Sequence, residues 1–256
     1  MCDMVYESQQ RERVACLFAG WKNVMIRSCL MGIMGRLYVN DKEGCDSAMV
    51  ILGDFHFLAG QPKEELVTYR TDEDGEFMIL VPQSKEWEEA IEKCYGERAK
   101  RIVRYAMNKS PGSFDKPALQ RVVSTLPEGY ELKRIDESLF WRCRTLSWCS
   151  DWVSQYDNYE QYQAYGIGVV IQTDGAPVSG ASSYSGYPGA IEIQVDTKEE
   201  YRRRGLAHIC GAKLILDCLE QGWYPEWDAH NLGSARLAKK LGYQYDHAYP
   251  AYEIRK

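Results

Sequence analysis

The sequence predicts an α/β (α+β) protein with two domains, and three observations support this class. The chain has 256 residues, 45% of them hydrophobic, which is enough to bury one large core or two modest ones. Stretches with strand-like alternation and stretches with helix-like spacing follow one another along the whole chain. Residues 108–117, with two prolines and a glycine, form a loop-like break. We place an N-terminal α/β domain at residues 1–125 and a second domain at residues 126–256.

Composition and charge exclude several classes of protein. The formal net charge of -6 makes the surface as a whole repel nucleic acid and anionic lipid. The nine cysteines stand singly, without a Cys-x-x-Cys pair, as is typical of reduced thiols inside the cell. No apolar run reaches the roughly 18 residues of a membrane-spanning helix. We therefore expect a cytoplasmic protein whose partners are neither nucleic acid nor membrane.

The first half of the chain shows secondary structure but no chemical motif. Apolar residues spaced by three and four predict a helix within residues 11–35. One extended segment is predicted from Gly53 to Gly60. The other predicted elements are strands at 36–40, 47–52, 76–81 and 101–107 and helices at 63–68 and 85–95. The role of this half is not predicted.

The second half has a clearer rhythm. An Asp174-Gly175 turn joins two strands as a hairpin, and an aromatic-rich stretch at residues 136–156 is predicted to be helical with a break near Ser150. The remaining predicted elements are helices at 118–126, 158–165, 206–221 and 233–240, strands at 130–135, 168–172, 177–183, 190–195 and 224–229, and an extended segment at 243–254.

One stretch, from Val195 to Ala207, carries the chemistry. It leads from an apolar/polar alternating strand through three consecutive arginines and Gly205 into a long amphipathic helix. Such a turn directs backbone N–H groups and the positive end of a helix dipole at one place, which suits a diphosphate. A solvated arginine cluster at a helix start is the alternative, although cations there oppose the dipole.

Two segments resemble the GCN5-related N-acetyltransferases (GNAT). Arg202, Gly205 and Ala207 fill the three fixed positions of that family's diphosphate loop, Gln/Arg-x-x-Gly-x-Gly/Ala. Downstream, Asn231, Ser234 and the Leu241-Gly242-Tyr243 run are similar to the family's Asn-x-x-Ser/Ala and Leu-Gly-Phe/Tyr segment. The resemblance covers about residues 126–256 and implies a mixed, mostly antiparallel central sheet flanked by helices.

The first half contains a Gly53-Asp54-Phe55 to Gly60 stretch that is similar to the zwittermicin-resistance-type branch of the same superfamily. We hypothesise that residues 1–125 are a degenerate GNAT-like copy, because strands and helices alternate there on a similar scale.

The resemblance implies acetyl-CoA as co-substrate, without a metal. Val195 offers a backbone N–H to the thioester carbonyl, and the amides near Gly205 bind the diphosphate. Val195 as a core residue and Asn231 as a helix cap stay open as alternatives. The candidate cofactor-binding residues are Val195, Asp196, Thr197, Arg202, Arg203, Arg204, Gly205, Leu206, Ala207, His208, Asn231 and Ser234.

The attacking amine is mostly protonated at neutral pH, so the reaction needs a base. Glu192 alternates away from its apolar neighbours, which puts its carboxylate on the strand face where members of the resembled family often carry a base. Glu192 is therefore the candidate base, and a solvated strand carboxylate is the alternative. Many relatives carry a tyrosine acid where this chain has Ala238. Tyr243, Tyr245 and Tyr249 are the replacements considered, and Tyr249 is carried forward as the candidate acid.

The acceptor is expected to contact the aromatic stretch, with Asp151 holding a cationic group and Trp148 lining the pocket; plain core packing is the alternative. We expect an acetyl-CoA-dependent N-acetyltransferase acting on a primary amine of a small molecule. A CoA-binding or regulatory module with reduced catalysis is the second reading, motivated by Ala238. The four histidines lack metal-ligand spacing. A homodimer is kept open because the sequence does not decide the assembly.

Overall fold

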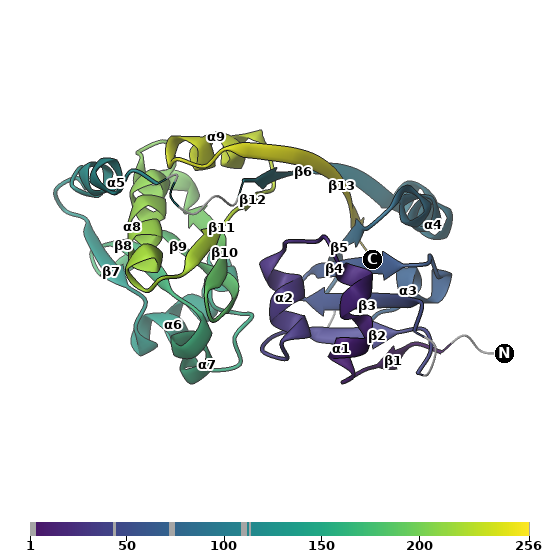
Figure 1. Ribbon diagram of the computed structural model, residues 1–256. Helices are drawn as coiled ribbons and strands as arrows, with labels where there is room; N and C mark the ends of the chain where they lie inside the picture. Colours follow the sequence, from purple (N-terminus) through teal and green to yellow (C-terminus); the bar gives the residue numbers. More distant parts are fainter. Residues whose placement is uncertain (1–3, 43–44, 72–74, 109–111, 113, 256) are drawn as a thin grey trace. The chain divides into compact units, whose positions relative to one another are not determined.

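Figure 1 shows the computed structural model, which describes residues 4–42, 45–71, 75–108, 112 and 114–255. The chain forms two compact units: unit 1 comprises Met1–Arg104 with Ala248–Lys256, and unit 2 comprises Tyr105–His247. The chain passes from unit 1 to unit 2 within strand β6 (Ala99–Met107) and returns to unit 1 within strand β13 (Tyr245–Arg255). Part of the predicted loop at 108–117, residues 109–111 and 113, lies outside the described residues.

Unit 1 is built on a sheet in which β1 to β5 follow one another in space and β13 pairs antiparallel with β5. Strands β4 and β5 are parallel, whereas β1 with β2, β2 with β3 and β3 with β4 are antiparallel pairs. All six residues of β3 are buried, because the sheet is covered on both faces, by α2 and by α3 with α4. The elements are β1 (Tyr6–Glu7), α1 (Arg11–Val14), 3-10 helix η1 (Ala15–Phe18), α2 (Val24–Leu30), β2 (Arg36–Val39), β3 (Ser47–Leu52), β4 (Phe55–Gly60), α3 (Glu64–Thr68), β5 (Phe77–Pro82), α4 (Lys85–Tyr95) and η2 (Gly96–Arg98).

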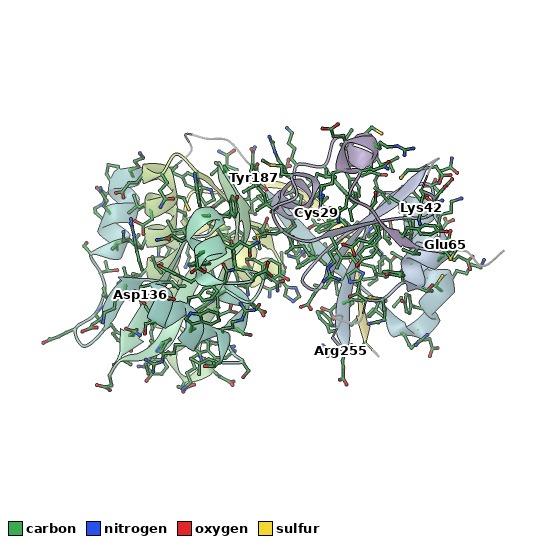
Figure 2. The ribbon with its side chains drawn as sticks, turned by 90° about the horizontal axis from the view of Figure 1, so that it is seen from below. Cys29, Lys42, Glu65, Asp136, Tyr187 and Arg255 are labelled. Carbon is green, nitrogen blue, oxygen red and sulfur yellow. The ribbon has the colours of Figure 1, made fainter. Side chains whose placement is uncertain are left out.

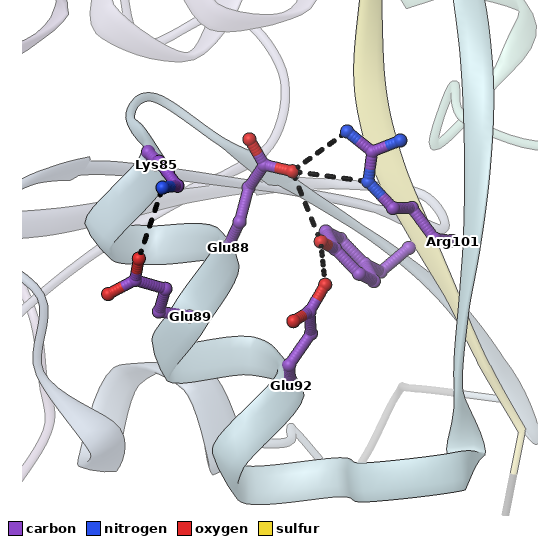
Figure 3. A network of polar contacts seen from close by, with 6 residues as sticks. Lys85, Glu88, Glu89, Glu92 and Arg101 are labelled. Atoms are coloured by element: carbon purple, nitrogen blue, oxygen red, sulfur yellow. Dashed lines mark hydrogen bonds and ion pairs between the residues drawn. The ribbon is translucent and has the colours of Figure 1, made fainter.

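A polar network fixes α4 against the strands of unit 1. Glu88 accepts hydrogen bonds from Nε and Nη2 of Arg101, drawn as dashed lines in Figure 3. The two distances are 3.2 and 3.0 Å. The hydroxyl of Tyr252 on β13 lies 3.2 Å from Glu88 and 2.6 Å from Glu92. Burial raises the pKa of Tyr252, and its bond to Glu92 raises it further. The C-terminal strand is therefore anchored in unit 1 by side chains as well as by its ladder.

Unit 2 has a five-stranded sheet in the order β11-β10-β9-β8-β7, in which only β10 and β11 are parallel. The mixed, mostly antiparallel sheet flanked by helices is thus confirmed. Its elements are α5 (Lys116–Val123), β7 (Glu131–Arg134), α6 (Glu137–Arg144), η3 (Ser150–Trp152), α7 (Tyr159–Tyr165), β8 (Gly168–Thr173), β9 (Ala176–Tyr187), β10 (Ala190–Thr197), η4 (Glu199–Tyr201), α8 (Leu206–Glu220), β11 (Tyr224–Glu226), β12 (Asp228–Ala229) and α9 (Leu232–Lys240).

The two faces of this sheet carry different side chains. Ile191 and Ile193 of β10 join the apolar core that packs against α8, together with residues of α5 and α9. The other face receives η3, α6 and α7; Asp136, the N-cap of α6, and Tyr187, the last residue of β9, are labelled in Figure 2. There Trp152 lies so close to Gly180 that a Cβ on that glycine would meet the indole ring at 2.5 Å. A glycine in β9 is therefore required for this packing.

Helix α8 is held to the sheet by a buried carboxylate. Asp217 is fully buried and accepts hydrogen bonds from Nε and Nη2 of Arg134 on β7 at 3.2 and 2.8 Å. Lys213, one turn earlier on α8, also pairs with Asp217. Because an unpaired buried charge is costly, this fork fixes where α8 lies, and with it the start of the helix.

Four predictions of local structure were wrong. The strand expected at 224–229 is divided into β11 and β12, which belong to different sheets. The helix expected within 11–35 is broken into α1, η1 and α2, because the Asn23 side chain accepts from the N–H of Ile26 and caps a new helix. Gly53 lies in the turn of a hairpin that pairs Leu52 with Phe55, so 53–60 is not one extended segment. The aromatic stretch 136–156 is helical only in α6 and η3, since α6 ends at Arg144.

The compact units do not coincide with the predicted domains 1–125 and 126–256. Residues of α5 pack against α8 in unit 2, and the end of β13 pairs with β5 in unit 1. As a boundary between the acetyltransferase domain and an N-terminal domain, residue 125 stays a prediction, as does the degenerate copy in residues 1–125.

Arg134→Ala is expected to lower the free energy of unfolding of unit 2 by about 2 kcal/mol, because the buried Asp217 loses two hydrogen bonds from a charged group. The loss is no larger because Lys213 still pairs with Asp217. Lys133→Ala is the matched control, since Lys133 on the same strand makes an exposed pair with Glu131 that contributes less than about 1 kcal/mol. Urea unfolding followed by tryptophan fluorescence measures both. Equal losses for the two variants would contradict the role given to Asp217.

Candidate active site

The candidate residues gather along β10 in unit 2. Antiparallel pairing with β9 runs the length of the strand, with a bulge between Glu192 and Ile193. Parallel pairing with β11 covers three positions and ends where Glu192 lies beside Glu226. In the described part of the chain, β10 therefore has a neighbouring strand on one side only from Ile193 to Thr197. We call this side the open edge.

The register shows which backbone groups face the open edge. Ser183 on β9 donates its N–H to Ile167, away from its register partner Ile193. In an antiparallel pair, the partner of such a residue also points its N–H and C=O outward, and the pattern repeats at every second residue. Ile193, Val195 and Thr197 therefore present their backbone groups to the open edge. Val195 has the N–H orientation that its predicted role needs.

The open edge leads into the start of α8, a helix of 15 residues. Gly205 is its N-cap in the left-handed conformation, with φ of 80°, and no side chain caps the helix. The N–H groups of residues 203–207 have no hydrogen-bond acceptor among the described residues. Five consecutive donors at the positive end of a helix form the kind of site that binds a diphosphate.

The three arginines have different tasks. Arg202 donates from Nε to the carbonyl of Thr197 at 3.1 Å, which closes the loop back onto β10. Arg204 donates to the Tyr130 hydroxyl at 3.2 Å and to the carbonyl of Glu200 at 3.0 Å. Within the described residues, the exposed Arg203 makes no hydrogen bond or ion pair, yet it is held at φ of 62°, which is unfavourable for a residue with a Cβ.

Glu192 is 5% exposed and lies on the face of β10 opposite the α8 core. Its Oε1 accepts from the backbone N–H of Asp228 at 3.0 Å, which fixes the carboxylate. The negative charges here also affect two nearby tyrosines. Burial raises the pKa of Tyr224 to about 12, and the charge of Glu226 contributes to this shift. Burial also raises the pKa of Tyr243, and the charges of Glu192 and Glu226 add to that shift. A solvated strand carboxylate, the alternative for Glu192, does not describe this position.

Asp196 continues the same face and meets η3. Its Oδ2 accepts from Nε1 of Trp152 at 3.1 Å and from Nε2 of Gln194 at 2.9 Å. Burial raises the pKa of Asp196, and the charge of Asp151 raises it further. The surrounding protein also desolvates Asp151 and raises the pKa of its carboxyl. Trp148 packs edge-on against Trp152, with ring centroids 5.1 Å apart.

The sequence pattern of a known family matches almost the whole chain. The model of the family described as GNAT acetyltransferase covers residues 15–252. The chain belongs to the GNAT acetyltransferase family. It is therefore an acyltransferase, and the resemblance found in the sequence is confirmed at the level of the superfamily. The zwittermicin-resistance-type branch stays a prediction.

Individual relatives agree with this membership. The uncharacterized N-acetyltransferase YdfB of Bacillus subtilis (strain 168) is 30% identical over 237 residues, which cover 86% of this chain and 85% of the Bacillus protein. The crystal structure of a GCN5-related N-acetyltransferase-like protein from Streptococcus suis 89/1591 is 46% identical, with a TM-score of 0.91 and coverage of 96% of this chain and 99% of that one. A GCN5-related N-acetyltransferase from Kribbella flavida, 16% identical with a TM-score of 0.53 over 82% of this chain and 86% of that one, shares the fold.

Two other predicted cofactor residues of this GNAT enzyme have structural partners. Asn231 is the N-cap of α9, with Oδ1 accepting from the N–H of Ser234 at 3.0 Å. The Ser234 hydroxyl accepts from Nε1 of Trp227 at 2.9 Å. The capping reading of Asn231 thus describes what it does here. Burial lowers the pKa of His208, and its buried Nε2 finds no hydrogen-bond partner among the described residues.

The candidate general acid is the least supported position. Ala238 is fully buried in the apolar core, so the place of the family's tyrosine holds a methyl group. Tyr243 is also buried, and its hydroxyl donates to the carbonyl of Pro225 at 2.7 Å. Tyr249 lies half-buried on the part of β13 that belongs to unit 1, whereas the other candidates belong to unit 2. Its role stays a prediction.

Two residues beside Glu192 were missed. Ser185 on β9 and Glu226 on β11 are its register partners on either side. The alternation of Glu226 and Asp228 around Trp227 was a signal for Glu226, but nothing in the sequence pairs Ser185 with Glu192. Among the described residues, no group of three metal-ligating side chains is found, and no helix is long and apolar enough to cross a membrane.

Asn231→Ala is expected to lower the stability of unit 2 by about 1 kcal/mol, because α9 loses its cap. Asn231→Ser keeps a capping oxygen and should restore most of this loss, while it removes the amide donor. Urea unfolding and CoA affinity by calorimetry separate the two readings of this residue. A weakened CoA affinity in Asn231→Ser at unchanged stability would show that the amide also binds the cofactor.

Proposed function

We propose that this enzyme transfers an acetyl group from acetyl-CoA directly to a primary amine of a small molecule. The observation that carries the proposal is the open edge of β10 running into the five unpaired N–H groups at the start of α8. The arm of acetyl-CoA ends in a thioester, contains amide groups and leads to a diphosphate. An edge of unpaired backbone groups followed by an anion-binding turn is complementary to these groups in the same order.

The residues proposed to hold acetyl-CoA follow this order. Val195, Asp196 and Thr197 lie along the arm, with the outward N–H of Val195 available to the thioester carbonyl. Residues 202–208 surround the diphosphate, where the unpartnered Nε2 of His208 is a further polar atom. Asn231 and Ser234 are proposed at the far end of the arm, with the Asn231 amide and the Ser234 hydroxyl as donors.

The chemistry then requires little more than a proton acceptor and a stabilised oxyanion. The Glu192 carboxylate, held by Asp228, accepts the proton of the incoming ammonium so that the nitrogen can attack. The N–H of Val195 donates to the carbonyl oxygen as it becomes negative. A thiol with a pKa near 8.5 leaves readily as thiolate, so a general acid is not indispensable, and the role of Tyr249 stays a prediction.

The acceptor is proposed to be a cationic small molecule that reaches Glu192 along the face carrying Asp196, Asp151 and Trp148. Burial and the charge of Asp151 raise the pKa of the Asp196 carboxyl, and the nearby Arg202 offsets only part of this shift. A second positive group on the acceptor would neutralise this pair, with the indole of Trp148 beside it. Amines with two cationic groups should therefore be the better substrates.

The test is release of free CoA thiol from acetyl-CoA in the presence of a linear diamine, an amino sugar and an amino alcohol. Acetylation of at least one amine, with a higher kcat/KM for dicationic amines than for monocationic ones, supports the proposal. The second candidate, motivated by Ala238, is a CoA-binding module with reduced catalysis. Tight CoA binding without turnover of any amine would favour it over the enzyme proposed here.

Glu192→Gln is expected to lower kcat at neutral pH by about a hundredfold or more, the usual contribution of a general base. Its rate should rise with pH until the free amine, near pKa 10, prevails, because no residue then removes the proton. Steady-state kinetics from pH 6 to 10 at saturating acetyl-CoA measures this, with the exposed Glu131→Gln as control. An unchanged rate and pH profile would remove Glu192 from the mechanism.

Arg203→Gly is expected to weaken CoA binding about tenfold at low salt, with a smaller loss at high salt, because one charge facing the diphosphate is removed. The stability should stay unchanged or rise slightly, since glycine adopts φ of 62° without strain. Calorimetric titration with CoA at two ionic strengths, and urea unfolding, measure the two effects. An unchanged CoA affinity would mean that Arg203 is a solvent-exposed side chain that does not contact the cofactor.

A further inference from the structure

Three oxygen-bearing side chains form one row across the sheet at the position where the open edge begins. Glu192 on β10 is in register with Ser185 on β9 and with Glu226 on β11. Register partners in a sheet point to the same face, and neighbouring strands lie about 4.8 Å apart, so the three side chains are adjacent. They are 0%, 5% and 9% exposed for Ser185, Glu192 and Glu226, so the row is almost free of solvent.

The hydroxyl of Ser185 has no hydrogen-bond partner in the part of the chain that the structure describes. The other buried serines of this strand are engaged: Ser182 and Ser183 bond to Tyr162 and Tyr156, and Ser179 to Thr197. A buried hydroxyl without a partner is unfavourable and uncommon, which calls for an explanation at this one position. Two carboxylates beside this hydroxyl favour a positively charged ligand, and an ammonium group there would donate to the Ser185 oxygen.

We propose that Ser185 and Glu226 complete, together with Glu192, the binding site of the acceptor nitrogen. This inference rests on the proposed function, because it concerns the amine of that reaction. A primary ammonium has three N–H donors, and the row offers one oxygen-bearing group to each. Glu192 and Glu226 are slightly exposed to solvent, whereas Ser185 is not. The amine therefore enters from the side of the two glutamates, and Ser185 lies at the inner end of the row.

The row also explains why one carboxylate is not enough. Glu192 takes a proton from the ammonium, the N–H bond breaks, and the nitrogen lone pair forms the new bond to the thioester carbon. The carbon–sulfur bond breaks with its electron pair on sulfur, and the remaining excess proton leaves with the thiol or to solvent. Glu226 accepts a hydrogen bond from the nitrogen while Glu192 carries the proton. The substrate class is therefore primary amines that arrive as ammonium ions.

The experiment compares Ser185→Ala and Glu226→Gln with the wild type, using the panel amine with the highest kcat/KM and its N-methyl derivative. Each substitution is expected to lower kcat/KM for the primary amine at least tenfold, the usual effect of losing a hydrogen bond to a charged group. The KM of acetyl-CoA stays unchanged. The preference for the primary over the N-methyl amine narrows in Ser185→Ala, because the third acceptor is gone.

Two buried residues of unit 1 provide matched controls. The Ser47 hydroxyl is as buried as that of Ser185 but bonds to the carbonyl of Gln61, and Glu253 is 8% exposed and pairs with Lys100 at 2.8 Å. Ser47→Ala and Glu253→Gln should lose stability and keep kcat/KM, whereas Ser185→Ala should keep its melting temperature and lose kcat/KM. This opposite pattern separates a binding role from a structural one.

The outcomes are distinct. Wild-type activity with unchanged kinetics in Ser185→Ala and Glu226→Gln overturns this inference and leaves the proposed function standing. A loss of kcat/KM in Ser185→Ala that is equal for the primary and the N-methyl amine also overturns it. Failure of the wild type to acetylate any amine of the panel overturns the proposed function, and this inference with it.

Discussion

Everything proposed for this enzyme depends on the separation of β10 from β11 after Glu192 and Glu226. Up to that pair the two strands are hydrogen-bonded to each other; beyond it, β10 continues to Thr197 with no neighbouring strand on that side in the described part of the chain. Unpaired polar backbone groups need a partner, and an extended molecule with amide groups is a natural one. A bulge lies at the same place, between Glu192 and Ile193, and a bulge changes the local direction of a strand.

Packing on both faces of the sheet holds this arrangement. On one face, the fork of Arg134 and Lys213 on Asp217 fixes α8, so that its unpaired N–H groups continue the open edge of β10. On the other face, Trp152 packs on Gly180 and donates to Asp196, which ties η3 to the far end of β10. The site is thus built from elements whose positions are set by buried contacts, while Arg203 supplies exposed charge at its rim.

The sequence predicted the parts of the site that are local in the chain. Glycine and arginine types at residues 202–207 define the turn, and apolar spacing defined α8 to within one residue. The partners of Glu192 were not predicted, because Ser185 and Glu226 reach it only through the registers of β9 and β11, and a bulge shifts one of them. For Asn231 the sequence allowed two interpretations, a helix cap and a cofactor ligand. Only the structure showed that its side chain caps α9. The return of β13 to unit 1 is a long-range pairing that alternation alone does not assign.

Residue-resolved amide hydrogen exchange, measured with and without CoA, tests the central claim most directly. Without ligand, the amides of Val195 and residues 203–207 should exchange fast, since no acceptor in the described chain holds them, while Gln194 and Asp196, which face β9, exchange slowly. CoA should slow exchange at Val195 and at 203–207 and leave Gln194 and Asp196 nearly unchanged. Protection that is absent from both segments, or that appears only elsewhere in the chain, would contradict the assignment of the open edge and the α8 turn as the acetyl-CoA site.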